Sequence, residues 1–149
     1  MLDLSKLLPQ APAHYAGPKL PFYFLIVIAV TGTIRSLVHL LAPDGGAGTI
    51  AHLALDVPGG RNIVAIFAQW GASQLLLALF YWVAILRYRF LTPLMLLAVF
   101  IEQVLRLIAG TLKPLEVGAA PPGAIATYVL LPIAFAMFLA SLWNFRRIA

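Results

Sequence analysis

Four apolar runs, each long enough to cross a membrane as a helix, dominate this chain. The predicted spans are 22–41, 62–86, 92–112 and 124–143. A helix needs about 20 residues to cross about 30 Å of hydrocarbon, so every run meets the length requirement. The sequence therefore predicts an all-α integral membrane protein. Its single transmembrane domain, residues 1–149, is expected to form a four-helix antiparallel bundle.

The composition agrees with a membrane location and excludes most soluble functions. Hydrophobic residues make up 62% of the chain, charged residues 10%, and the mean hydropathy is +0.97. Five acidic and ten basic side chains cannot cover a soluble sphere of this size, which excludes a cytosolic enzyme and a nucleic-acid-binding module. The chain has no cysteine, so thiol nucleophiles, iron–sulfur clusters and Cys-ligated zinc are excluded as well.

Local signals mark where the predicted spans begin and how they connect. Pro21 precedes the first span, Asn62 is expected to cap the second, and Thr92 opens the third. Pro132 predicts a kink in the fourth span. Residues 87–90 form so short a connection that the second and third spans are expected to pack as an antiparallel hairpin.

The first outer loop contains a short amphipathic segment, residues 49–57. Ile50 and Leu53 share one face of this segment at helical spacing, and His52 and Asp56 share another. We expect a short interfacial helix lying on the outer membrane surface.

Basic residues predict the orientation of the chain in the membrane. The opposite loops carry only Arg61 and Lys113. Six basic residues lie on the side of the two termini: Lys6, Lys19, Arg87, Arg89, Arg146 and Arg147. The positive-inside rule therefore predicts that the N- and C-termini are both cytoplasmic.

Polar side chains inside the predicted spans carry most of the functional information. Arg35 and His39 lie on one stripe of the first span, Gln69 lies on the second, and Glu102 and Arg106 stand one turn apart on the third. All of these except His39 fall roughly 8 to 16 Å below the outer surface, at about 1.5 Å per residue. Ionisable groups at such depth usually face the interior of a bundle. The pattern predicts a polar layer closed toward the cytoplasm.

The charges of this layer do not balance. Arg35 and Arg106 face only Glu102, which leaves one positive charge uncompensated. A carboxylate of the first outer loop, Asp44 or Asp56, could balance it. A bound carboxylate, phosphate headgroup or phenolate-like ligand could do the same, and the guanidinium fork suits such anions. The sequence leaves both sources open.

The predicted ligand-binding residues come from the first three spans: Arg35, His39, Gln69, Trp70, Glu102 and Arg106. We expect this site to bind a small anionic or amphiphilic molecule without a metal or cofactor. Haem is not expected, because His39 is the one histidine near a span. Gln74 and Gln103 are expected to form hydrogen bonds between helices.

Two other functions are compatible with the same residues. The chain could be an accessory or assembly subunit of a larger membrane complex, or a homodimer, with a purely structural polar layer. It could also be a membrane enzyme that acts on a lipid-like substrate, with Glu102 and His39 as catalytic acid and base. A helix face contacting another protein would favour the accessory subunit.

The plan of four spans, no cysteine and a polar layer toward one face resembles the small bacterial membrane proteins of the DoxX-like group and related families of unknown function. The resemblance covers most of the chain in size, hydropathy and span count, and no motif matches residue by residue. It implies a compact helical bundle in a bacterial-type inner membrane. It implies no activity and no site residue.

Overall fold

The computed structural model describes residues 14–117 and 120–143, which contain four α-helices and no strand. The helices are α1 (Lys19–Leu41), α2 (Gly60–Leu86), α3 (Thr92–Leu112) and α4 (Pro122–Ser141), and a single 3-10 turn, η2 (Arg89–Leu91), precedes α3. Each α-helix is long and apolar enough to cross a membrane. The prediction of an all-helical protein with four candidate spans is confirmed for this part of the chain.

The helices begin close to the predicted positions, and the differences have local causes. α1 begins at Lys19 rather than at residue 22, and Pro21 lies within its first turn, where a missing N–H breaks no intrahelical bond. α2 begins at Gly60 because Gly59 is its N-cap, with a left-handed backbone at φ 91°. Asn62, the predicted N-cap, therefore lies inside the helix. Glycine adopts such a backbone at little steric cost.

The interfacial helix predicted over residues 49–57 is not formed. The connection from α1 to α2 consists of turns followed by irregular backbone. His52 has a positive φ of 58°, which a right-handed helix does not allow. The Asp44 carboxylate also accepts hydrogen bonds from the backbone N–H groups of Gly46 and Thr49, at 2.9 and 2.7 Å. This side chain therefore holds the backbone in a turn at the start of the predicted segment.

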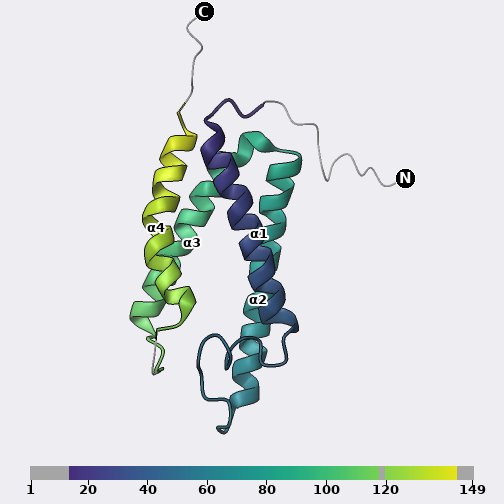
Figure 1. Cartoon of the computed structure of the whole chain (residues 1–149), viewed down its shortest axis with the longest axis vertical. Helices are drawn as coiled ribbons and strands as arrows, with labels where there is room; N and C mark the ends of the chain where they lie inside the picture. Colours follow the sequence, from purple (N-terminus) through teal and green to yellow (C-terminus); the bar gives the residue numbers. More distant parts are fainter. Residues whose placement is uncertain (1–13, 118–119, 144–149) are drawn as a thin grey trace, which may run out of the picture.

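The four helices associate mainly as two pairs. α1 packs along α2, and α3 packs along α4, while the contacts between the pairs are fewer (Figure 1). Although the connection between α2 and α3 is short, these two helices have few contacts with each other. The connection at 87–90 therefore does not make them the closest pair. Figure 1 shows α1 beginning and α4 ending at one end of the molecule, which we name the terminal end. The opposite end, with residues 42–59, is the loop end.

A glycine permits the close approach of α1 and α2. Gly71 is buried, and a Cβ atom at this position would lie 2.7 Å from the His39 Cβ and 3.0 Å from the Ser36 carbonyl oxygen. Any larger residue would force the helices apart. Ser36 is also buried, and its hydroxyl donates to the Gly32 carbonyl at 2.7 Å, so this polar group is satisfied at the contact.

The apolar core lies in the half of the molecule nearest the terminal end. Its buried residues come from all four helices: Leu25, Ala29, Tyr81, Ile85, Leu96, Val99 and Ala134. Apart from Lys19 at the start of α1, the charged residues of the four α-helices lie toward the loop end of this core. The molecule thus has an apolar half and a half that holds the polar layer.

Candidate ligand-binding site

Side chains from three helices meet in one charged cluster, which consists of Arg35 (α1), Gln74 (α2), and Glu102 and Arg106 (α3). Glu102 Oε1 accepts hydrogen bonds from Nε and Nη2 of Arg106, at 2.8 and 2.6 Å. Arg35 Nη2 lies 3.9 Å from the same oxygen. Gln74 Oε1 accepts from Arg35 Nη2 at 2.9 Å and from Arg106 Nη2 at 3.0 Å. One carboxylate oxygen and one amide oxygen therefore hold two guanidinium groups together.

The indole of Trp70 supports both arginines of this cluster. The Cζ atoms of Arg35 and Arg106 lie 5.4 and 5.1 Å from the centroid of its ring. Such cation–π contacts are favourable and strengthen where water is excluded. Trp70 precedes Gln74 by one helical turn, so the ring and the amide face the same two cations. Trp70, a predicted ligand-binding residue, is thus in direct contact with the cluster.

His39 is placed differently from the prediction. The sequence puts it near the membrane interface as a ligand-binding or catalytic residue, yet its exposed fraction is only 5%. Its Nδ1 lies 2.7 Å from the Gly45 carbonyl oxygen, which can only accept, so Nδ1 carries the proton. The ring packs on Trp70 and Phe67, with centroids 4.7 and 5.7 Å away. His39 joins α1 to the loop, and within the described residues it forms no direct hydrogen bond or ion pair with Glu102.

Gln69 does not belong to the cluster, and Gln74 takes its place. Gln69 is exposed, and its backbone carbonyl accepts the hydroxyl hydrogen bond of Ser73 at 3.1 Å. The side chains of adjacent helical residues point about 100° apart. When Trp70 faces the cluster, the side chain of Gln69 therefore points away from it. The expectation that Gln74 joins neighbouring helices is confirmed, because its oxygen binds arginines from α1 and α3.

A cavity of about 190 Å³ lies between the four helices beside the cluster. Its polar lining residues are Thr31, Arg35, Gln74, Tyr81, Glu102, Gln103 and Thr127. Two buried polar atoms of this lining, Arg35 Nε and Tyr81 Oη, have no hydrogen-bond partner among the residues described. Such atoms are costly to bury unless a partner is present. Tyr81 and Thr127 were not predicted from the sequence, although Tyr81 lies three turns after Trp70 on the same face of α2.

A groove between α2 and α3 reaches the same cluster from the outside. It has a volume of about 510 Å³ and includes Trp70, Gln74, Glu102 and Arg106 in its lining. The rest of its wall is apolar: Leu77, Ala98, Ile101, Leu105 and Ala109. The groove and the cavity share Gln74, Leu77 and Glu102. Charged and apolar surfaces therefore meet at one place.

The loop carboxylates do not balance the excess positive charge. Both ion pairs within the described residues involve Glu102. The two hydrogen bonds that Asp44 accepts from the backbone lower its pKa to about 2 and fix it in the loop turn. Asp56 is exposed to solvent. The sequence allows two sources of a balancing anion, the loop carboxylates and a bound ligand. The loop carboxylates make no contact with Arg35 or Arg106 among the described residues.

Comparison with protein-family models, curated proteins and solved structures gives no match to this chain. The resemblance to the DoxX-like group therefore stays one of size, hydropathy and span count. Within the residues that the structure describes, no group of three or more His, Asp and Glu side chains is placed to hold a metal ion. The described part of the chain thus has four helices that are candidate membrane spans and two arginines around one tryptophan.

Proposed function

We propose that this chain is a multi-pass inner-membrane protein that binds a small anionic or amphiphilic molecule at the cluster of Arg35 and Arg106. The observation that carries the proposal is the charge balance. Two guanidinium groups share one carboxylate, Glu102, and no other acidic side chain in the described chain contacts them. An uncompensated charge in a low-dielectric layer is costly. A carboxylate or phosphate group of a ligand would remove that cost.

The cavity offers donors for such an anion. Arg35 Nε and the Tyr81 hydroxyl are buried, line the cavity and have no partner among the described residues. Sites for drug-sized ligands have volumes of about 300–1,000 Å³. The cavity, at about 190 Å³, suits a headgroup rather than a whole amphiphile. The apolar wall of the groove between α2 and α3, with Ile101 and Leu105, would receive the tail.

The same proposal includes the arrangement in the membrane. We propose an antiparallel bundle whose termini are cytoplasmic, so that the cluster lies in the outer half. Support comes from the six basic residues on the side of the termini against two on the other side. Three of the six, Lys6, Arg146 and Arg147, lie outside the described residues. A reporter fused after Ala149 should be active in the cytoplasm, and periplasmic activity would overturn the orientation.

Fluorescence of Trp70 tests the binding site locally. The variant Trp82→Phe/Trp143→Phe leaves Trp70 as the one tryptophan and is placed in phosphatidylcholine nanodiscs. Decyl phosphate should change the emission of Trp70 saturably, whereas decanol, with the same chain and no charge, should not. Arg35→Gln should weaken binding at least tenfold, because a hydrogen bond to a charged group contributes about 1.5–3 kcal/mol.

Arg61→Gln is the matched control, because it removes the same charge at the loop end, where Arg61 is exposed. It should leave the affinity for decyl phosphate unchanged. Equal weakening by Arg35→Gln and Arg61→Gln, or no saturable response to decyl phosphate, would overturn the proposal. The hypothesis of an accessory subunit with a structural polar layer would then replace it.

A further inference from the structure

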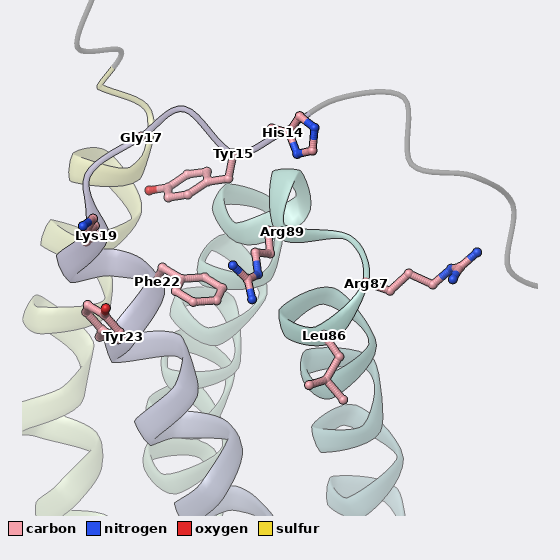
Figure 2. A pocket seen from close by; sticks show the side chains of 9 residues that line it. All are labelled: His14, Tyr15, Gly17, Lys19, Phe22, Tyr23, Leu86, Arg87 and Arg89. Atoms are coloured by element: carbon pink, nitrogen blue, oxygen red, sulfur yellow. The ribbon is translucent and has the colours of Figure 1, made fainter.

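A second cavity lies at the terminal end of the molecule and shares no lining residue with the charged cluster. It has a volume of about 520 Å³ and lies between the start of α1 and the connection from α2 to α3 (Figure 2). Its lining includes three cationic residues, Lys19, Arg87 and Arg89, and the rings of Phe22 and Tyr23. The described residues that line it include no acidic side chain. The cavity is therefore suited to an anion.

Arg89 is held in place to bind that anion. Its Nε donates to the Ile85 carbonyl at 3.3 Å, and its Cζ lies 5.1 Å from the centroid of the Phe22 ring. In Figure 2 the guanidinium of Arg89 points into the cavity beside Phe22, whereas Arg87 extends away from it. The terminal nitrogens of Arg89 have no hydrogen-bond partner among the described residues. A guanidinium fixed by Nε and one ring face keeps its fork of donors for a phosphate.

The segment before α1 closes one side of this cavity. The hydroxyl of Tyr15 donates to the carbonyl of Pro18, the N-cap of α1, at 3.0 Å, and this bond folds the segment back on itself. Burial raises the pKa of Tyr15. Lys19 follows directly, as the first residue of α1, and also lines the cavity. Two cations from different elements, Lys19 and Arg89, therefore border one space.

Apolar side chains at the same cavity point to a lipid rather than a free anion. Leu86 is 75% exposed and Tyr23 is 57% exposed, and both line the cavity. They belong to α2 and α1, which are long and apolar enough to cross a membrane. A free phosphate would gain no binding free energy from these apolar side chains, because it has no apolar surface to bury against them. An amphiphile gains from both surfaces, because its headgroup meets the cations while its chains cover exposed apolar residues.

We propose that this cavity binds the phosphate headgroup of an anionic phospholipid. Arg89 and Lys19 contact the phosphate, and the acyl chains lie along Leu86 and Tyr23. The proposal is independent of the ligand proposed for the charged cluster, since it involves other residues at the other side of the core. Each cation near an anionic lipid contributes about fivefold in affinity, which corresponds to about 1 kcal/mol. Removing both cations should therefore lower the affinity about 25-fold.

Native mass spectrometry of the full chain tests this lipid site. Protein stripped of lipid in a neutral detergent is titrated with phosphatidylglycerol and with phosphatidylcholine of the same acyl chains. The wild-type protein should bind phosphatidylglycerol at least tenfold more tightly. Lys19→Gln/Arg89→Gln should abolish that preference. Arg89→Lys keeps the charge and removes the guanidinium fork, so it should reduce the preference for phosphatidylglycerol severalfold. This single variant tests the site even if the double variant does not fold.

The control variant Arg61→Gln/Lys113→Gln removes the same charge at the exposed loop end of the molecule. It should keep the preference for phosphatidylglycerol. Equal loss in the two double variants would show a general charge effect and overturn the site. Displacement of phosphatidylglycerol by millimolar inorganic phosphate would also overturn the lipid assignment, because it would identify a site for the free anion.

Discussion

Replacing Glu102 with Gln removes the one carboxylate of the described residues that faces both arginines, and it leaves the side chain nearly the same size. Glu102 Oε1 lies 2.6 Å from Arg106 Nη2 and 3.9 Å from Arg35 Nη2. Breaking a buried ion pair by removing one partner costs roughly 3–5 kcal/mol in soluble proteins. The side chains of Arg35, Arg106 and Glu102 are 37%, 18% and 17% exposed, so screening lowers this cost. We expect Glu102→Gln to reduce the free energy of unfolding by about 2 kcal/mol.

Titration with SDS in mixed micelles, followed by circular dichroism, measures that loss. Glu116→Gln is the matched control, because Glu116 is exposed and has no ion pair in the described part of the chain. The control should unfold at the wild-type SDS fraction. Adding Arg106→Gln to Glu102→Gln should recover part of the loss, because the two sites are coupled. Equal stability of Glu102→Gln and Glu116→Gln would refute the electrostatic role of Glu102.

Three further predictions concern packing and the loop. Gly71→Ala should destabilise the fold by about 1–3 kcal/mol, because the new Cβ overlaps the facing helix. The control Gly110→Ala should not destabilise it, because the space around Gly110 is open. The same SDS titration measures both variants. His39→Ala should cost about 3 kcal/mol in that assay, since it removes buried ring packing and the hydrogen bond to Gly45. The folded pKa of Asp44, about 2, lies below its ordinary 3.8, so its contribution to stability is complete above pH 3.8 and is lost as the pH falls toward 2. Asp44→Asn should remove that part of the pH dependence of the melting temperature.

The spans and the charged cluster could be predicted from the sequence for the same physical reason. A long apolar run has few alternatives to a membrane helix, and an ionisable side chain within it must find partners. Arg35, Glu102 and Arg106 were therefore expected to meet, and the structure brings them together. The spacing of Glu102 and Arg106 placed them on one helical face before any tertiary contact was known.

Other features depend on tertiary packing and could not be predicted. The rotation of α2 decides whether Gln69 or Gln74 faces the arginines, and Gly71 fixes that rotation through its contact with α1. The same contact buries His39, which local sequence places near the interface. The loop shows the limit of helical spacing as a signal. Asp44 holds the turn at the start of this segment, and the left-handed backbone of His52 interrupts helical geometry within it.

A crystal structure of the protein with an alkyl phosphate that carries bromine at the end of its chain tests the anion site most directly. Anomalous scattering locates the bromine, and the density of the phosphate shows which side chains bind it. We expect the phosphate within hydrogen-bonding distance of Arg35 Nε and of the Tyr81 hydroxyl, with the bromine in the groove beside Leu105. A phosphate bound only at Lys19 and Arg89, with none at Arg35, would contradict the proposed function.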